Sequence, residues 1–174
     1  MINSLKKNEI ITERLRLAPL GDASGDEIIR IMKDESVRRT YMVPLLETRE
    51  AEAKLFSSLK NATLSDVRIA YGVYFGGEAV GFLNDVGFED GSIEIGYVIS
   101  PKYQNRGFCT EALKAVIAEL FRIGFSTVKA GYFEENIPSR RVMEKCGMKE
   151  TSETEEIEYM GIVHKCKYMA IEKE

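Results

Sequence analysis

The spacing of apolar residues changes along the chain, and these changes divide it into predicted strands and helices. Residues 11–17 alternate between apolar and charged side chains, which predicts a half-buried strand ending before Pro19. Apolar residues then recur at helical spacing in "GDEIIRIMKDESVRRTY", residues 25–41, and in "TREAEAKLFSSLKNA", residues 48–62. We expect two helices after the first strand, the second with Thr48 as its N-cap.

The middle of the chain is typical of an antiparallel strand meander. Three runs rich in β-branched and aromatic residues cover residues 68–75, 78–88 and 92–100. The pairs Gly76-Gly77 and Asp90-Gly91 separate them, and such pairs favour hairpin turns.

After the meander the pattern becomes helical again. An apolar stripe begins after Thr110 and predicts a core-facing helix that ends at Gly124. A strand over residues 126–133 and a short helix over residues 137–146 follow, and the acidic segment 149–158 then precedes a strand candidate at residues 158–171. We find no internal repeat or linker, so we expect one domain over residues 1–174 with a mixed-sheet α/β layer fold.

Composition narrows the classes of function. The 174 residues are 44% hydrophobic and 30% charged, which is enough to build one substantial core. The formal charge of -4 argues against a nucleic-acid surface based on bulk positive potential. No window approaches the roughly 20 apolar residues of a membrane span, and the N-terminus lacks the apolar run of an export signal. We therefore expect a cytoplasmic protein without a membrane or nucleic-acid partner.

The cysteines and the histidine give little sign of their own chemistry. Cys109, Cys146 and Cys166 are odd in number and lack C-x-x-C spacing, so neither a disulfide framework nor a zinc site is expected. The single histidine, His164, argues against a histidine-based metal cluster. A Cys-His hydrolase would need His164 and Cys166, but their spacing is that of one face of an alternating strand. We expect no metal.

One loop carries stronger chemistry. Lys102, Gln104, Asn105, Arg106 and Gly107 lie between a predicted strand and the helix that follows. Free N–H groups and the dipole at a helix N-terminus point in the same direction, so this turn is suited to binding an anion. Neither the P-loop pattern nor the dinucleotide pattern G-x-G-x-x-G is present.

Four stretches resemble the GNAT superfamily of N-acetyltransferases. "YQNRGFCTEAL" resembles the family's acyl-CoA pyrophosphate loop, Q/R-x-x-G-x-G/A, through Gln104 and Gly107, although Cys109 replaces the small last residue. "NIPSRRVMEKCGM" is similar to the downstream segment through Asn136, Ser139, Gly147 and Met148. "TERLRLAPL" and "IEIGYVISP" are similar to the Rim-type branch, which includes acetyltransferases of ribosomal-protein N-termini.

The resemblance implies a fold and a cofactor site. The implied fold is a mixed, mostly antiparallel central sheet with helices on both faces and a splayed strand pair that receives acyl-CoA. A glycine in the loop would allow close approach of backbone to phosphate, or positive φ. The residues implied to bind acetyl-CoA are Val98, Ile99 and Ser100 on the strand, Gln104, Arg106, Gly107, Phe108, Cys109 and Thr110 in the loop, and Asn136 and Ser139 beyond it.

The resemblance also suggests catalytic residues. Glu94 is the candidate base, since carboxylates on this strand serve that role in several family members; a paired or solvated surface glutamate is the alternative. Met143 stands where many members carry a proton-donating tyrosine, so Ser139 is the candidate acid; a serine that only bonds backbone in the first helical turn is its alternative. The acidic segment before the last strand is either a solvated face or, as the resemblance implies, a segment near the acceptor that attracts a cationic amine.

The expected function is acetyl-CoA-dependent N-acetylation of a primary amine, either a peptide N-terminus or a small-molecule amine. The Cys109 and Met143 departures keep a second class open, an acyl-CoA-binding sensor or interaction module without turnover. We expect a monomer or a homodimer.

Overall fold

The computed structural model describes residues 7–174, and one eight-stranded sheet runs through them in the order β1-β2-β3-β4-β5-β6-β8-β7. Among the strands of residues 7–174, only β5 and β6 pair in parallel and every other neighbouring pair is antiparallel, which confirms the mixed, mostly antiparallel sheet. The strands are β1 (Ile10–Ile11), β2 (Arg16–Ala18), β3 (Ala70–Phe75), β4 (Glu78–Glu89), β5 (Ser92–Ile99), β6 (Thr127–Phe133), β7 (Lys149–Tyr159) and β8 (Ile162–Glu172).

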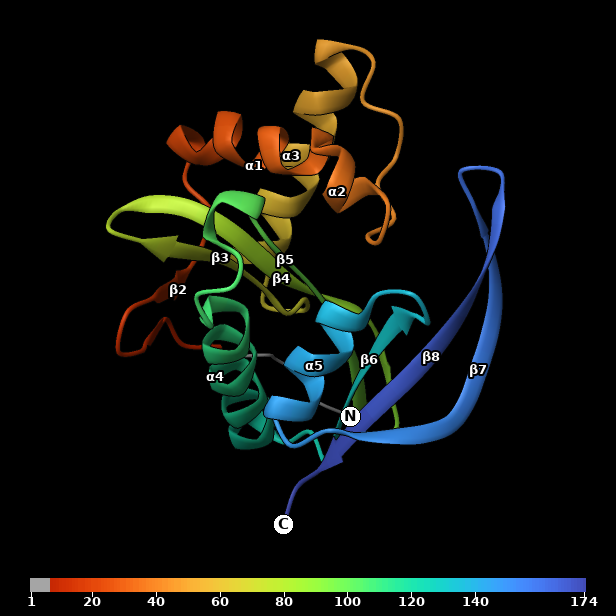
Figure 1. Cartoon of the computed structure of the whole chain (residues 1–174). Helices are drawn as coiled ribbons and strands as arrows, with labels where there is room; N and C mark the ends of the chain where they lie inside the picture. The colour runs from red at the N-terminus through yellow and green to blue at the C-terminus, as the bar shows by residue number, and fades with distance from the viewer. Residues whose placement is uncertain (1–6) are drawn as a thin grey trace.

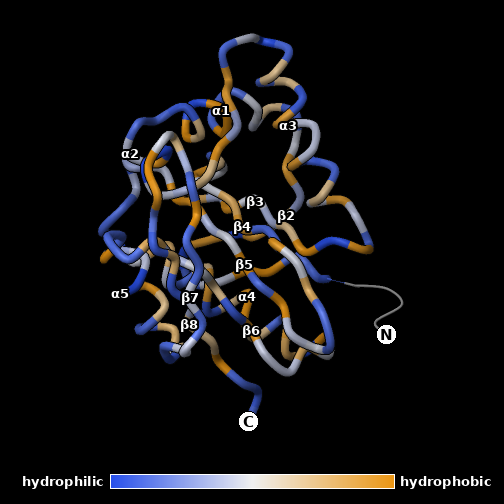
Figure 2. Tube along the Cα trace, turned by 90° about the vertical axis from the view of Figure 1, so that its right-hand side faces the viewer, coloured by the Kyte–Doolittle hydropathy of each residue, from blue (hydrophilic) through white to orange (hydrophobic). Residues whose placement is uncertain are grey.

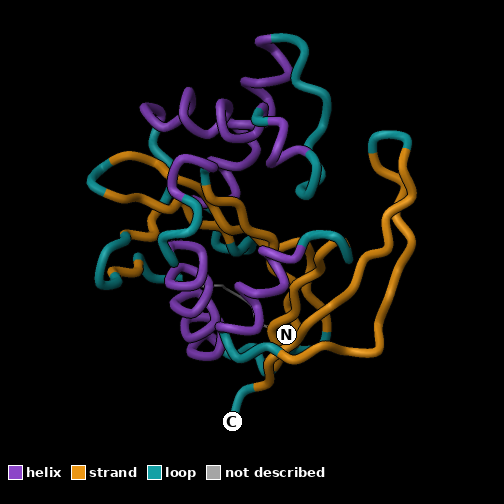
Figure 3. The backbone as a smooth tube through the Cα atoms, viewed as in Figure 1, coloured by secondary structure: helices purple, strands orange, loops and turns teal. Residues whose placement is uncertain are grey.

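Helices cover both faces of this sheet (Figure 1). Successive strand residues point to opposite faces, so Phe82 enters a core cluster with α1 and α3, whereas Leu83 enters a cluster with α4. Figure 3 shows the two groups of helices on either side of the strands. The helices are α1 (Gly25–Lys33), α2 (Glu35–Arg38), α3 (Arg49–Leu64), α4 (Phe108–Ile123) and α5 (Ile137–Lys145), with short 3-10 turns at Asp22–Ser24 (η1) and Pro101–Tyr103 (η2).

The predicted caps of α3, α4 and α5 are confirmed. The Thr48 side chain accepts a hydrogen bond from the N–H of Ala51, and the Asn136 side chain accepts one from the N–H of Ser139 at 3.3 Å. Gly124 ends α4 in the left-handed conformation, with φ at 116°. The meander of β3, β4 and β5 is confirmed as well.

Two predictions near the N-terminus were wrong in detail. The strand expected over residues 11–17 is interrupted: β1 and β2 pair with each other across a turn closed by the N–H of Thr12 and the carbonyl of Leu15. The helix expected over residues 25–41 is broken at Asp34, which has an extended backbone. The Asp34 carboxylate accepts the N–H groups of Ser36 and Val37, so this side chain begins a new helix instead of continuing the old one.

The C-terminal prediction also needs correction. The acidic segment 149–158 forms strand β7, and the single strand expected over residues 158–171 contains the tight turn at Met160-Gly161 between β7 and β8. Strand β7 is the edge of the sheet and is hydrophilic over most of its length (Figure 2). Its many carboxylates suit an edge position, because charges there discourage pairing with another chain.

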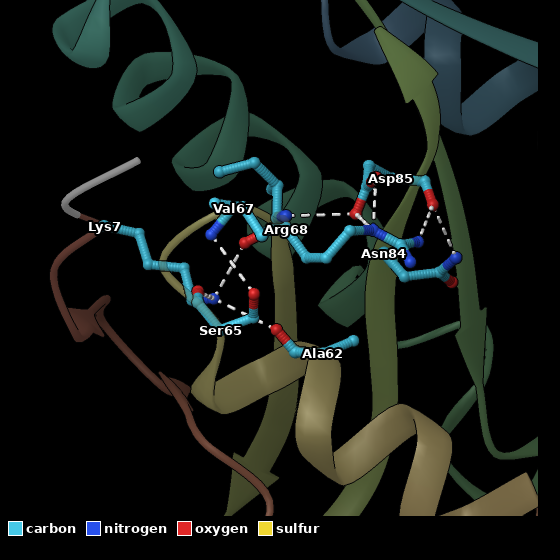
Figure 4. A network of polar contacts seen from close by, with 8 residues as sticks. Lys7, Ala62, Ser65, Val67, Arg68, Asn84 and Asp85 are labelled. Atoms are coloured by element: carbon cyan, nitrogen blue, oxygen red, sulfur yellow. Dashed lines mark hydrogen bonds and ion pairs between the residues drawn. The ribbon is translucent and has the colours of Figure 1, made fainter. Parts of the chain in front are cut away.

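A polar network supports the start of β3 and the middle of β4 (Figure 4). The Asp85 side chain is 3% exposed; it accepts hydrogen bonds from Arg68 Nε at 2.8 Å and from the N–H of Ile69 at 3.0 Å. Lys7 Nζ joins the same region by donating to the carbonyls of Ala62, Ser65 and Arg68. The network lies beside a bulge in β4 between Asp85 and Gly87, opposite the strand that carries Glu94.

Candidate functional site

Strands β5 and β6 diverge, as the resemblance implied. They pair in parallel only where Ser92–Glu94 meets Thr127–Lys129, after which β5 stays with β4 and β6 stays with β8. The divergence opens a cleft of about 1300 Å³. The cleft is lined by residues of both strands, the loop before α4, α5 and the α2–α3 connection, and it includes the predicted Glu94, Val98, Ile99, Gln104, Gly107, Phe108, Cys109, Thr110, Asn136 and Ser139.

Along β5, every second residue directs its backbone N–H and C=O groups toward the cleft. The N–H of Ser100 donates to the carbonyl of Val80 at 2.8 Å, and the carbonyl of Val98 lies against Gly81, so both residues turn their backbone groups toward β4. By the alternation of an extended strand, Tyr97 and Ile99 turn theirs toward the splay. The Ile99 carbonyl there accepts a hydrogen bond from Gln104 Nε2 at 3.1 Å. Tyr97 was not predicted from the sequence.

The loop before α4 has the geometry of an anion site. Asn105 and Gly107 have φ of 60° and 78°, a region that favours glycine and tolerates asparagine. The first backbone hydrogen bond of helix α4 joins the N–H of Glu111 to the carbonyl of Gly107. The N–H groups of Phe108, Cys109 and Thr110 therefore have no acceptor within the helix and point out of its N-terminus.

Side chains around the loop pack into the core, lie over an aromatic ring or place positive charge beside it. The Cys109 side chain packs against the core, and burial raises the pKa of its thiol, so this departure from the family pattern points inward. The Arg106 guanidinium lies 5.3 Å from the Tyr103 ring centre. Two lysines that the sequence analysis did not single out, Lys114 and Lys145, line a smaller hollow of about 350 Å³ beside Gly107 and Thr110.

A pair of hydroxyls lies where α5 faces β5. Tyr97 Oη is 2.9 Å from Ser139 Oγ and also donates to the Ser139 carbonyl at 3.2 Å. Burial raises the pKa of Tyr97 far above its usual value, so the phenol stays protonated. Met143, one turn further along α5, is fully buried in the core and presents nothing to the cleft.

Glu94 is a half-buried carboxylate in the same cleft. No hydrogen bond or ion pair involves it within residues 7–174. Burial raises its pKa above the ordinary value, Lys129 opposes that shift, and Glu153 and Glu155 add to it. A carboxylate with a raised pKa and no partner is suited to accepting a proton from a bound molecule.

Gly131 on β6 provides the space around this carboxylate. A Cβ at Gly131 would lie 3.0 Å from Tyr168 Cε1, 3.2 Å from Cys166 Sγ and 3.4 Å from Glu94 Oε1. A glycine inside a strand often marks such a close approach, which is the one sequence signal that could have indicated this position.

The far end of the cleft is acidic and aromatic. The Tyr168 hydroxyl donates to Glu155 at 2.9 Å, and Glu135 pairs with His164, whose ring stacks on Phe133 with centres 4.3 Å apart. His164 and Cys166 therefore have separate partners and do not form a nucleophile–base pair, as the sequence analysis expected. Within residues 7–174, no group of histidine, cysteine and carboxylate side chains could hold a metal, and no helix there is long and apolar enough to cross a membrane.

The arrangement combines three chemical capacities in one cleft. Free N–H groups at a helix N-terminus can bind a phosphate, and an unpaired stretch of strand can bond an extended amide chain. Beside them lie an unpaired carboxylate, Glu94, and a hydroxyl pair, Tyr97 and Ser139.

Comparison with solved structures finds close likeness in fold. An acetyltransferase of the GNAT family from Bacillus anthracis superposes with a TM-score of 0.82 at 23% identity, over 95% of this chain and 98% of that one. RimL, a ribosomal L7/L12 α-N-protein acetyltransferase solved with coenzyme A, has a TM-score of 0.83 at 15% identity and covers 98% of both chains. The microcin C7 self-immunity acetyltransferase MccE, solved with acetyl-CoA and AMP, has a TM-score of 0.81 at 11% identity, over 93% of this chain and 94% of that one.

Sequence comparison agrees with this fold. A curated relative, the uncharacterized N-acetyltransferase YnaD of Bacillus subtilis (strain 168), is 41% identical over 63 residues, a match that spans 36% of this chain and 37% of that protein. The family model of the acetyltransferase (GNAT) domain matches residues 14–149, most of the chain and all of the loop, splay and α5 described above. The chain therefore belongs to the GNAT acetyltransferase family.

Proposed function

We propose that this chain transfers the acetyl group of acetyl-CoA to a primary amine by direct attack of the amine on the thioester. The observation that most supports this proposal is that three groups line one cleft, which ends at the N-terminus of α4: the unpaired, half-buried carboxylate of Glu94 and the paired hydroxyls of Tyr97 and Ser139. Acyl transfer to an amine needs a proton acceptor on one side of the reacting carbonyl and a proton donor on the other.

The chain's own groups fit acetyl-CoA. The pyrophosphate would lie on the N–H groups of Phe108, Cys109 and Thr110 at the start of α4, with Lys114 and Lys145 nearby for further phosphate charge. The pantetheine amides would pair with the backbone of Tyr97 and Ile99, in the stretch where β5 has left β6. RimL and MccE, which share the fold, were solved with coenzyme A and acetyl-CoA respectively, and this supports the assignment.

The proton movements follow from the side chains. As the new C–N bond forms and the C–S bond breaks, Glu94 takes a proton from the amine and the Ser139 hydroxyl gives one to the departing sulfur. Ser139 then regains a proton from solvent and Glu94 releases to solvent the proton it took, so both side chains return to their starting states. The raised pKa of Glu94 makes it a better base than a solvated glutamate. The phenol of Tyr97 stays protonated and lies 2.9 Å from Ser139 Oγ, in a hydrogen bond in which either oxygen can be the donor, so it restricts how the Ser139 hydroxyl can turn.

The favoured acceptor is a peptide α-amine. An α-amine has a pKa near 8 and a lysine near 10.4, so presenting a neutral lysine costs about 3 kcal/mol more at neutral pH. A single carboxylate base handles the α-amine more easily. The acidic end of the cleft, with Glu135 and Glu155, favours a positively charged acceptor, and the likeness in fold to RimL supports a protein N-terminus.

One observation keeps the sensor as a second candidate: the usual tyrosine position is the fully buried Met143, which offers no acid. A release assay separates the two. The purified protein is incubated with acetyl-CoA and a panel of peptides with free N-termini, polyamines, amino acids and aminoglycosides, and free CoA thiol is measured. Acceptor-dependent release supports the transferase. CoA binding without any acceptor-dependent release supports the sensor.

A further inference from the structure

The turn between β1 and β2 contacts the first helical turn of α4. Glu111 Oε1 accepts hydrogen bonds from Thr12 Oγ1 at 2.6 Å and from the N–H of Arg14 at 2.9 Å. Its other oxygen, Oε2, accepts from Arg14 Nε at 2.7 Å and pairs with Arg14 Nη2 at 2.6 Å. Both oxygens of one carboxylate are thus engaged by two residues that lie more than ninety positions earlier in the chain.

Arg14 also contacts the loop itself. Its Nη1 donates to the carbonyl of Arg106 at 2.8 Å, and its guanidinium lies 4.7 Å from the centre of the Phe108 ring. A Cβ at Gly107 would lie 3.3 Å from Arg14 Nη2. One guanidinium therefore contacts residues 106 and 108 and lies beside the glycine between them.

These contacts act where the loop has little support of its own. Asn105 and Gly107 are in the left-handed region, and the N–H groups that follow have no acceptor in the helix, so local backbone bonding does not hold them in a convergent arrangement. The planar guanidinium of an arginine loses less side-chain conformational freedom per hydrogen bond than the ammonium group of a lysine would. It can also bind the Arg106 carbonyl and the Glu111 carboxylate at the same time.

Charge gives Arg14 a second effect. Burial opposes ionisation of Glu111, but the bonds from Thr12 and Arg14 outweigh it and hold the pKa of this carboxyl below its usual value. An ionised Glu111 one turn from the anion site would repel phosphate. Arg14 neutralises that charge while its own donors remain directed at Glu111 and Arg106 rather than into the cleft.

We infer that Arg14 is a positioning residue for cofactor binding: through Glu111 and the Arg106 carbonyl it holds residues 105–108 in the anion-binding conformation. This inference rests on the proposed binding of acetyl-CoA at the loop. It also gives a physical role to the opening "TERL" segment, whose Thr12 and Arg14 both bind Glu111.

The test compares Arg14→Gln, Arg14→Lys and the matched control Arg16→Gln. Arg16 is an exposed arginine two residues along, whose ion pair is with Glu9 and whose guanidinium lies over Tyr74, away from the loop. CoA affinity is measured by calorimetry, thermal unfolding without CoA checks that each variant is folded, and acetyl-CoA kinetics with an accepted amine separate KM from kcat.

Arg14→Gln is expected to weaken CoA binding about tenfold or more, because it removes several charged hydrogen bonds, with the loss in KM exceeding that in kcat. Arg14→Lys should recover only part of the affinity, and Arg16→Gln should bind like wild type. Wild-type affinity in folded Arg14→Gln, or equal loss in Arg16→Gln, would overturn the inference. Full rescue by Arg14→Lys would overturn it too, because charge alone would then suffice. Wild-type protein that binds CoA but acetylates nothing would contradict the proposed function and leave the affinity comparison valid.

Discussion

The hydroxyl oxygens of Tyr97 and Ser139 lie 2.9 Å apart, and the Tyr97 hydroxyl also reaches the Ser139 carbonyl. The two residues come from β5 and α5, on different elements that line the cleft. Tyr97 therefore limits how the Ser139 hydroxyl can turn. If Ser139 supplies the proton for the departing sulfur, its efficiency depends on this contact.

Tyr97→Phe is predicted to lower kcat by about 3- to 10-fold, the range expected for one hydrogen bond, because the ring is kept and only the hydroxyl is lost. Ser139→Ala should cost more, about 10- to 100-fold, since solvent can only partly replace the donor. Rates at saturating acetyl-CoA are compared in a double-mutant cycle. Because Tyr97 acts through Ser139, the double variant should be no slower than Ser139→Ala, and losses that multiply would show that Tyr97 acts independently.

Glu94→Gln should lower turnover by about 10²- to 10⁴-fold while CoA affinity stays near wild type. Glutamine keeps the shape of the side chain and loses its basicity. In wild type, the rate at low pH should rise as Glu94 ionises, with its pKa above the usual glutamate value because of burial. The variant should lack this limb. A small loss that does not vary with pH would leave Glu94 a structural residue.

The same substitution is predicted to stabilise the fold. When folding raises the pKa of a carboxyl, the contribution of that group to the stability of the fold is fully present at pH values below its unfolded pKa. The contribution is lost as the pH rises through the folded pKa. At pH 7 the ionised, partnerless Glu94 therefore lowers the stability of the fold. Glu94→Gln should be more stable than wild type at pH 7, and its gain in the free energy of unfolding should be larger at pH 7 than at pH 4. Urea unfolding at both pH values measures this. A variant less stable than wild type at pH 7 would mean that Glu94 has a stabilising partner.

Gly107 should matter more for CoA affinity than Arg106. A side chain at Gly107 is strained at φ 78° and would press on Arg14, whereas the Arg106 side chain is exposed and stacks on Tyr103. Gly124→Val is the matched control, because it imposes the same kind of backbone strain at the other end of α4, in open space. Calorimetry should show a large loss for Gly107→Val and a small one for Arg106→Ala. Equal losses in Gly107→Val and Gly124→Val would assign the effect to helix strain instead of the loop.

Local patterns in the sequence predicted much of the fold. Three of these patterns depend on residues close together in the chain, and all were confirmed: the apolar stripe of α4, the glycine that ends it, Gly124, and the hairpin turns of the meander. The break at Asp34 was missed because an aspartate inside a helical pattern can face solvent or cap a new helix, and spacing alone does not decide between them. Strand β7 was missed because charges dominate its pattern, although pairing with β8 holds it as a strand.

The site was predictable where a family motif covers it and less so elsewhere. Glu94, Gln104 and the residues from Gly107 to Thr110 do line one cleft. The predicted Ser100 and Arg106 do not: the Ser100 N–H is turned toward β4, and the Arg106 guanidinium lies over the Tyr103 ring. The contacts of Tyr97 with Ser139 and of Arg14 with Glu111 join residues 42 and 97 positions apart, and no local pattern encodes such pairs. For the same reason, the backbone of Tyr97 and not of Val98 faces the splay, which depends on how β4 pairs with β5.

The most direct test of the account is the position of the acetyl group on a single peptide that carries both a free α-amine and an internal lysine. The peptide is incubated with acetyl-CoA and wild-type protein, with Glu94→Gln as the control, and the product is located by fragmentation mass spectrometry. The account predicts acetylation at the α-amine, strongly reduced in the control. Acetylation of the lysine alone, or equal labelling by Glu94→Gln, would contradict it.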